Sequence, residues 1–84
     1  MAQLTVRIQK MAFQGDPAKI KAGDTIVWQN QDRMTHTATA DDGSFDTGNI
    51  PAGSTSKPIT FNKAGDVPYH CEIHPSMTGA VQVS

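Results

Sequence analysis

The sequence predicts an all-β protein, an antiparallel sandwich or barrel of about seven or eight short strands. Turn-forming groups rich in Gly, Pro and Asp recur about every eight to twelve residues, a spacing typical of such folds. Between these turns, apolar and polar residues alternate with the two-residue period of strands that are buried on one face. No stretch of about ten residues carries a helical period with capping residues at its ends.

The N-terminal part of the chain is expected to form two strands. Residues 3–9 alternate, so that Leu4, Val6 and Ile8 share the face that we expect to point into the core. A Gly-Asp-Pro turn follows, and a second, short strand is expected around Ile20.

Residues 25–30 predict the next strand. Their β-branched and aromatic side chains favour a sheet, with Ile26 and Trp28 facing inward. The polar residues that follow Asn30 are expected to turn the chain before the next extended segment.

Residues 35–40 are expected to form a strand whose two faces differ. Thr35, Thr37 and Thr39 share one face, which we expect to be solvated. His36 shares the other face with two small alanines, so its side chain is expected to point inward and to need a polar partner.

The C-terminal half is expected to supply the remaining strands. They are expected at residues 45–48, 54–61, 67–71 and 81–83, the first of them short or irregular. Alternation places Tyr69 and Cys71 on the inward face of their strand and sends His70 to the opposite face.

Composition limits the classes of function. The 84 residues are expected to form a single domain, residues 1–84, with a modest core, because only 37% of them are hydrophobic. Seven basic and eight acidic residues give a formal net charge of −1, which argues against nucleic acid as a partner. No apolar run approaches the roughly 20 residues that would cross a membrane, and we expect no secretory leader in this sequence.

Residues 71–77 contain three potential metal ligands at regular spacing. Cys71, His74 and Met77 are each separated from the next by two residues. A thiolate, an imidazole and a thioether are the soft donors that suit copper, and His36 offers a second imidazole. Two imidazoles and a thiolate in one plane, with a weak axial methionine, describe a blue copper electron-transfer site. We therefore expect His36, Cys71 and His74 in the plane and Met77 on the axis.

Each of these residues also has an ordinary structural interpretation. Cys71 could be an inert buried thiol, His36 a core histidine bonded to a carbonyl, and Met77 a packing residue, while His74 alone would be a surface residue. These interpretations leave the combination of four donor types at these spacings unexplained, which favours copper. His70 is excluded from the ligand set because it lies on the opposite face of its strand.

Other chemistries fit the residues less well. A structural zinc site uses three or four cysteines and histidines, and methionine is a poor fourth partner. Covalent haem attachment requires Cys-x-x-Cys-His, but residue 74 is histidine where the second cysteine would stand. A thiol nucleophile paired with a histidine would need a substrate cleft and an oxyanion hole, for which the sequence gives no signal. We therefore do not expect an enzyme.

Two segments carry a resemblance to a known family. The segment Gly-Asp-Thr-Ile-Val-Trp-Gln-Asn, within residues 21–30, is similar to the strand that precedes the first histidine ligand of cupredoxins. Residues 61–83 resemble the cupredoxin ligand loop and its flanking strands. The sequence is thus similar to the amicyanin and plastocyanin group of small blue copper proteins, and the two-residue gap between His74 and Met77 resembles amicyanin.

The resemblance implies a fold, a cofactor and a function. It implies an eight-stranded Greek-key sandwich that binds one copper ion through the four residues named above and carries single electrons between redox partners. It further implies a periplasmic or otherwise extracytoplasmic monomer whose partners dock on an apolar patch around His74, to which Met11, Ile73 and Pro75 would contribute. A copper carrier or storage protein without an electron-transfer role is the alternative.

Three residues depart from the amicyanin pattern. Thr35 stands where amicyanins have proline, and Ser76 replaces an aromatic residue in the ligand loop. Thr37 stands where most have an asparagine that ties the two ligand-bearing loops together.

Overall fold

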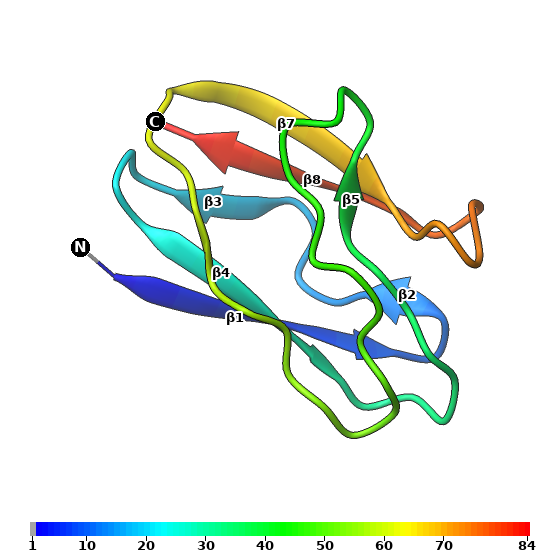
Figure 1. Ribbon diagram of the computed structural model, residues 1–84. Coiled ribbons are helices and arrows are strands. Elements are labelled where there is room, and N and C mark those ends of the chain that lie inside the picture. Colours follow the sequence, from blue (N-terminus) through cyan, green and yellow to red (C-terminus); the bar gives the residue numbers. More distant parts are fainter. Residues whose placement is uncertain (1) are drawn as a thin grey trace.

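Two four-stranded sheets pack face to face in the computed structural model, which describes residues 2–84 (Figure 1). The strands are β1 (Gln3–Gln9), β2 (Ala12–Phe13), β3 (Ala18–Ile20), β4 (Thr25–Asn30), β5 (Thr39–Ala40), β6 (Ile59–Thr60), β7 (Gly65–His70) and β8 (Thr78–Val83). None of the described residues forms a helix, and so none forms a helix able to cross a membrane. The predicted all-β Greek-key sandwich of about eight strands is confirmed.

The two sheets are mixed rather than antiparallel. One has the strand order β2-β1-β4-β6 and the other β3-β8-β7-β5. The pairs β1/β4 and β3/β8 are parallel, with Val6 opposite Trp28 and Ala18 opposite Val81. The expectation of a purely antiparallel arrangement was therefore wrong. Parallel pairing arises because the chain crosses to the second sheet between β1 and β4, and so returns to the first sheet running in the same direction.

A group of aromatic side chains fills the space between the sheets. Trp28 and Tyr69 are both buried, and the Trp28 Nε1–H group donates a hydrogen bond of 3.2 Å to the Tyr69 hydroxyl. Phe45 stacks on Trp28 at a centroid distance of 5.4 Å, and Phe13 meets Tyr69 edge to face at 4.7 Å. Burial raises the pKa of the Tyr69 hydroxyl, so it remains a neutral donor and acceptor.

The inward faces were largely predicted. Val6, Ile8, Ile26 and Trp28 are buried as expected. Leu4 is an exception: it lies near the start of β1 and is 39% exposed.

Two predicted strands are much shorter in the structure. Of residues 54–61 only β6 belongs to a ladder, and of residues 35–40 only β5 does. Side-chain hydroxyl groups replace carbonyl acceptors in both segments: Ser56 Oγ accepts the Trp28 N–H at 2.9 Å, and Thr47 Oγ1 accepts the Ala38 N–H at 3.0 Å. These side-chain bonds satisfy the backbone where a regular ladder would otherwise continue.

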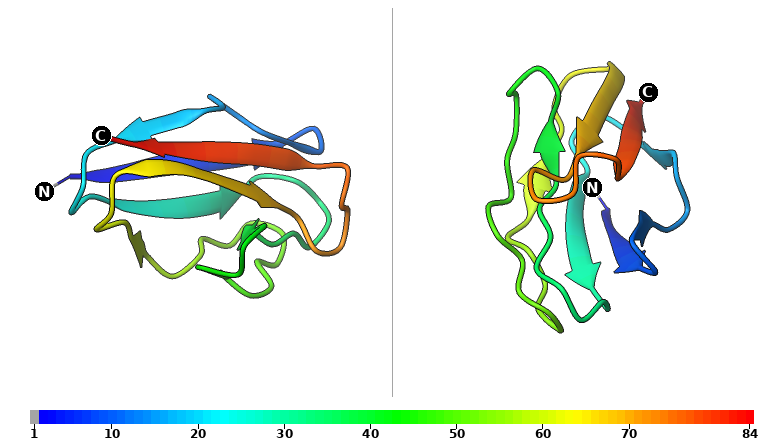
Figure 2. Two further views of the ribbon diagram at one scale, coloured as in Figure 1. Left: turned by 90° about the horizontal axis from the view of Figure 1, so that it is seen from above. Right: turned by 90° about the vertical axis from the view of Figure 1, so that its right-hand side faces the viewer.

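Both ends of the described chain lie at one end of the sandwich (Figure 2). The carbonyl of Ala2 accepts a hydrogen bond from the Thr25 N–H, and the carbonyl of Ser84 accepts one from the Ala22 N–H. The loop of residues 71–77 lies at the opposite end (Figure 1).

We predict that Gly79→Ala destabilises the fold by about 1–3 kcal/mol, the usual cost of overpacking a core. A Cβ atom at position 79 would lie 2.6 Å from Cζ of Tyr69, whose ring is held by its aromatic neighbours and by Trp28. Urea denaturation measures the change. Thr78→Ala, at an exposed position of the same strand, is the control and should change stability by less than about 0.5 kcal/mol. Equal effects of the two substitutions would contradict the packing argument.

Candidate metal centre

Three segments meet at the end of the sandwich that carries the 71–77 loop. His36 lies between β4 and β5, and its backbone exchanges two hydrogen bonds with Ile50, of 3.1 and 2.7 Å. Cys71 directly follows β7, and Met77 directly precedes β8. Because β5 pairs with β7 in a register that sets Thr39 opposite His70, the segment that carries His36 runs past Cys71.

The donor atoms of His36, Cys71 and His74 converge. The Cys71 Sγ atom lies 3.7 Å from Nδ1 of His36 and 3.9 Å from Nδ1 of His74, and all three atoms lie within 4.8 Å of one another. A sulfur and a nitrogen bound to one metal at about 2.3 and 2.0 Å in a trigonal plane would be about 3.7 Å apart. The donor set therefore fits a single ion, and these three residues are arranged to bind one.

The three donors differ in exposure. His36 and Cys71 are fully buried, whereas His74 is partly exposed. Met77, the fourth predicted ligand, is also buried, and its place on the axis remains a prediction. Two backbone hydrogen bonds close the loop: the Cys71 N–H donates to the Met77 carbonyl, and the Met77 N–H donates to the His74 carbonyl.

The surroundings of Cys71 favour its thiolate. Burial alone would raise the pKa of this thiol, but the hydrogen bond from the Thr37 N–H, the neighbouring His36 ring, and the backbone and ring of His74 outweigh burial and lower the pKa to about 6. The Thr37 N–H lies 3.4 Å from Sγ. The thiolate is the form that binds metals, so these contacts favour the metal-binding form of Cys71 in the metal-free protein.

Thr37 joins the two ligand-bearing segments. Its hydroxyl accepts a hydrogen bond of 2.8 Å from the Glu72 N–H and lies 3.1 Å from the hydroxyl of Thr39, which in turn donates to Asp46. The expectation that Thr37 and Thr39 face solvent was wrong: both are buried, because their hydroxyl groups form this chain. Thr37 thus provides a tie between the loops at the position where related proteins were expected to use asparagine.

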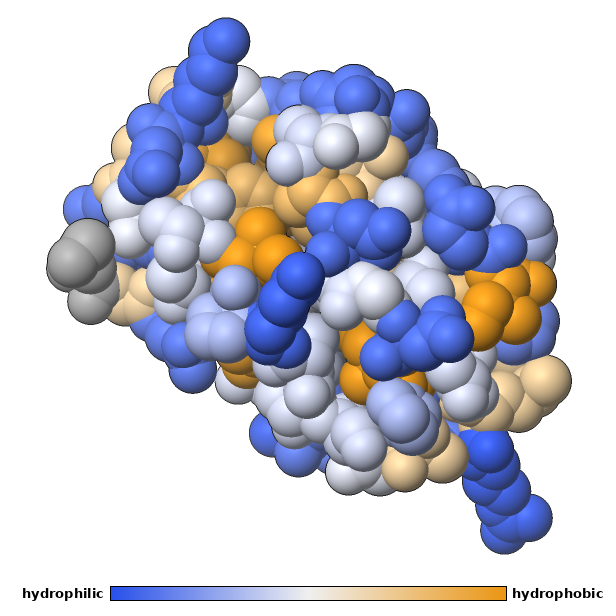
Figure 3. Space-filling model, in the orientation of Figure 1, coloured by the Kyte–Doolittle hydropathy of each residue, from blue (hydrophilic) through white to orange (hydrophobic). Residues whose placement is uncertain are grey.

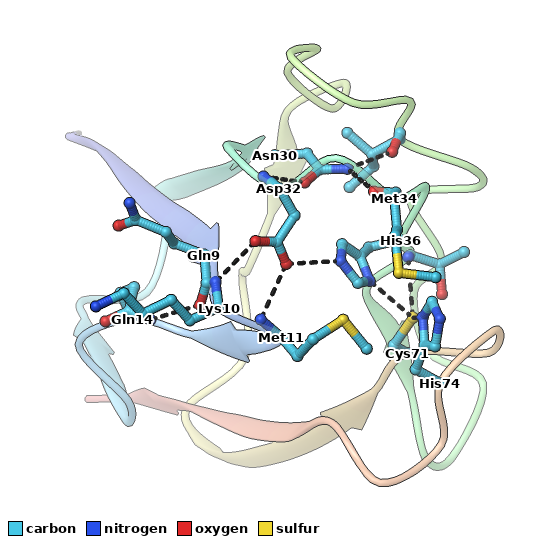
Figure 4. A network of polar contacts seen from close by, with 12 residues as sticks. Gln9, Lys10, Met11, Gln14, Asn30, Asp32, Met34, His36, Cys71 and His74 are labelled. Atoms are coloured by element: carbon cyan, nitrogen blue, oxygen red, sulfur yellow. Dashed lines mark hydrogen bonds and ion pairs between the residues drawn. The ribbon is translucent and has the colours of Figure 1, made fainter.

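Asp32 is a functional candidate that the sequence reasoning missed. Its Oδ2 atom lies 2.9 Å from Nε2 of His36, on the side of the ring opposite Cys71 (Figure 4). The sequence showed this residue only as part of a polar bend. An acidic residue four positions before a candidate histidine ligand was the available signal.

His70 lies outside the donor cluster, as predicted. Its Nδ1 atom lies 2.6 Å from an Asp41 carboxylate oxygen, and its Nε2 atom lies 2.8 Å from a Glu72 carboxylate oxygen. The hydrogen bond with Asp41 is the largest of the causes that raise the pKa of His70, and the hydrogen bond with Glu72 is the second. Both ring nitrogens of His70 therefore contact carboxylates, and the residue links two acidic side chains at the surface.

Comparison with known proteins supports the same chemistry. Residues 1–84 match the family model of copper binding proteins, the plastocyanin/azurin family. The chain is 32% identical to amicyanin of Paracoccus denitrificans and 34% identical to amicyanin of Paracoccus versutus, in each case over 95% of this chain. It spans 64% of the length of these two relatives.

Solved structures agree with the sequence matches. The crystal structure of amicyanin from Paracoccus versutus superposes with a TM-score of 0.84 at 34% identity, covering 96% of this chain and 80% of that one. The oxidized state of an amicyanin mutant gives a TM-score of 0.88 at 29% identity, covering 96% and 81%.

We predict that Thr37→Val destabilises the metal-free protein by about 1 kcal/mol, the usual net contribution of one hydrogen bond. The substitution keeps the shape of the side chain but removes the acceptor of the Glu72 N–H. Chemical denaturation of the metal-free form measures the loss. Thr60→Val, at an exposed position of β6, is the matched control and should have little effect. A Thr37→Val protein as stable as this control would show that the tie is dispensable.

Proposed function

Because the chain belongs to the plastocyanin/azurin family of copper-binding proteins, we propose that it is a blue copper protein that carries single electrons between redox partners. The observation that carries the proposal is the convergence of one buried thiolate and two imidazole nitrogens on a single point. This donor set combines the soft ligand that copper prefers with the nitrogen ligands that suit both of its oxidation states.

In this proposal His36, Cys71 and His74 would bind the metal, and Met77 would add a weak thioether ligand. Copper bound there would supply one-electron chemistry by alternating between Cu(I) and Cu(II). The sulfur donors favour the reduced ion, and the imidazoles keep the oxidised ion bound. Burial of Cys71 argues against a catalytic thiol, because a substrate could not reach it, and we therefore assign no enzymatic activity.

The backbone around the donors supports electron transfer rather than metal delivery. The backbone of His36 is fixed by Ile50, and the 71–77 loop is closed by its own hydrogen bonds. Donors held in this way keep one geometry in both oxidation states and retain the ion. A copper carrier or storage protein, the alternative function, would need a site that opens to release it.

His74 is the proposed contact point for partner proteins. It is the partly exposed donor, and Ile73 beside it is 46% exposed. Met11 and Met34 are 41% and 51% exposed, and both line a surface hollow with Asp32, the neighbour of His36. Hydrophobic residues also appear at this end of the molecule in the surface view (Figure 3).

An apolar docking patch and a formal net charge of −1 predict weak electrostatic steering, so that partner binding should depend little on salt. We further propose that the protein acts as a monomer in a periplasmic or otherwise extracytoplasmic compartment, as the resemblance to amicyanin implies.

We predict that the copper-loaded protein shows an intense visible absorption band from its thiolate ligand. Cys71→Ser should abolish the band, and Met77→Ala should keep copper bound but shift the reduction potential, because the axial ligand tunes it. Optical titration with copper and voltammetry measure both effects. His70→Gln, one residue from Cys71 but outside the donor cluster, is the control and should keep the band. A colourless copper-loaded wild type would refute the proposal.

We predict that Ile73→Gln slows electron self-exchange by about fivefold or more, because replacing one of the few residues that dominate an interface costs over about 1 kcal/mol. Line broadening in nuclear magnetic resonance spectra of mixed oxidised and reduced protein measures the rate. Leu4→Gln is the matched control, since Leu4 is 39% exposed and lies far from the site, near the end that holds Ala2. Equal rates for the two variants would remove Ile73 from the docking patch.

A further inference from the structure

We infer that Asp32 is a positioning residue of the metal centre, whose carboxylate fixes the tautomer and orientation of His36 and whose negative charge lowers the reduction potential. The first part concerns the protein's own residues and stands without a metal. The second part rests on the proposed function.

The contact between Asp32 and His36 selects one tautomer. The Asp32 Oδ2 atom lies 2.9 Å from Nε2 of a fully buried imidazole, while Nδ1 of the same ring lies 3.7 Å from the Cys71 sulfur. A carboxylate accepts and does not donate, so the proton belongs on Nε2 and Nδ1 keeps its lone pair. A carboxylate at the other ring nitrogen fixes the orientation of a ligand histidine.

The carboxylate of Asp32 is itself held from the other side. Its Oδ1 atom accepts the Lys10 N–H at 2.7 Å, and its Oδ2 atom also accepts the Met11 N–H at 3.0 Å. Lys10 and Met11 both adopt the left-handed conformation, with φ of 55° and 58°. Two successive non-glycine residues in this conformation are unfavourable, and here their N–H groups form a concave site for an anion.

Asn30 fixes the backbone that carries Asp32. Its Oδ1 atom accepts the Asp32 N–H at 2.9 Å, and its Nδ2 group donates to the carbonyls of Met34 and Ile50 at 2.7 and 2.8 Å. Ile50 is the residue whose backbone also pairs with His36. Asn30, Asp32 and His36 therefore form one connected network that joins the turn after β1 to the metal centre (Figure 4).

The environment keeps Asp32 ionised. Its two oxygen atoms accept hydrogen bonds from the Lys10 N–H and the Met11 N–H and face Nε2 of His36, and these contacts stabilise the carboxylate form. A fixed negative charge beside a ligand stabilises the more positive, oxidised form of a bound metal more than the reduced form. Removal of this charge should therefore raise the reduction potential.

A simpler alternative is that Asp32 only closes a turn, and Asp24 provides a matched control for it. The Asp24 carboxylate also accepts two backbone N–H groups, from Ala2 at 2.9 Å and from Lys21 at 3.0 Å, at the opposite end of the sandwich and without a histidine contact. Asp32→Asn and Asp24→Asn remove the same charge and the same kind of turn contact. Only Asp32→Asn alters the partner of His36.

The first test uses the metal-free protein. Nitrogen-15 chemical shifts of the His36 ring should show the Nε2–H tautomer in the wild type and in Asp24→Asn. In Asp32→Asn the ratio of Nε2–H to Nδ1–H should fall by about fivefold or more, as a charge-assisted hydrogen bond becomes a neutral one. Asp32→Glu, which keeps the charge and the acceptor, should restore the ratio at least in part. An unchanged ratio in Asp32→Asn overturns the positioning role, whether or not copper binds.

The second test uses the copper-loaded protein. Voltammetry should show a higher potential in Asp32→Asn than in the wild type, with Asp24→Asn close to the wild type. Equal shifts in the two variants overturn the role of the Asp32 charge. A wild type that gains no visible band with copper would instead refute the proposed function, and the tautomer measurement would still decide the positioning role.

Discussion

The burial of one thiolate is the constraint on which this structure depends. Cys71 is fully inside the protein, where an ionised sulfur needs donors to replace water. The Thr37 N–H and the His74 N–H of its own loop supply those donors. This requires a segment that lies 34 residues earlier in the chain to run directly past the sulfur. The pairing of β5 with β7 brings that segment there, and the aromatic core holds the sheets that carry both strands.

Two polar networks then hold the donors from different sides. Thr37, Thr39 and Asp46 link the ligand loop to the neighbouring segment, whereas Asn30 and Asp32 connect His36 to the turn after β1. Among the described residues, no buried side-chain nitrogen or oxygen lacks a hydrogen-bond partner. Fully satisfied networks specify one arrangement, whereas a partly satisfied network would cost more than an apolar core. The metal centre therefore owes its geometry to side chains that need not touch the metal.

The features that the sequence predicted depend on local pattern. The features that it did not predict depend on contacts between residues that are far apart in the chain. Alternation gave the buried faces of β1 and β4, and the donor types with their spacing indicated a site that includes His36 and Cys71. The parallel pairing of β1 with β4 depends on how the chain crosses between sheets, which alternation does not encode. The role of Thr37 depends on a hydrogen bond with Glu72, 35 residues away, which local pattern does not reveal. The polarity of Thr37, taken alone, favoured a position on the solvated face.

The positions of Ala2 and Ser84 have a practical consequence. Ala2 and Ser84 are both bonded to the segment of residues 22–25, at the end of the sandwich opposite the metal centre. A surface linker or fusion partner attached at either end would leave His74 and its apolar surroundings facing outward. Immobilised on an electrode through a terminal tag, the protein would present its metal centre to solution, whereas adsorption through the apolar patch would turn that centre toward the electrode.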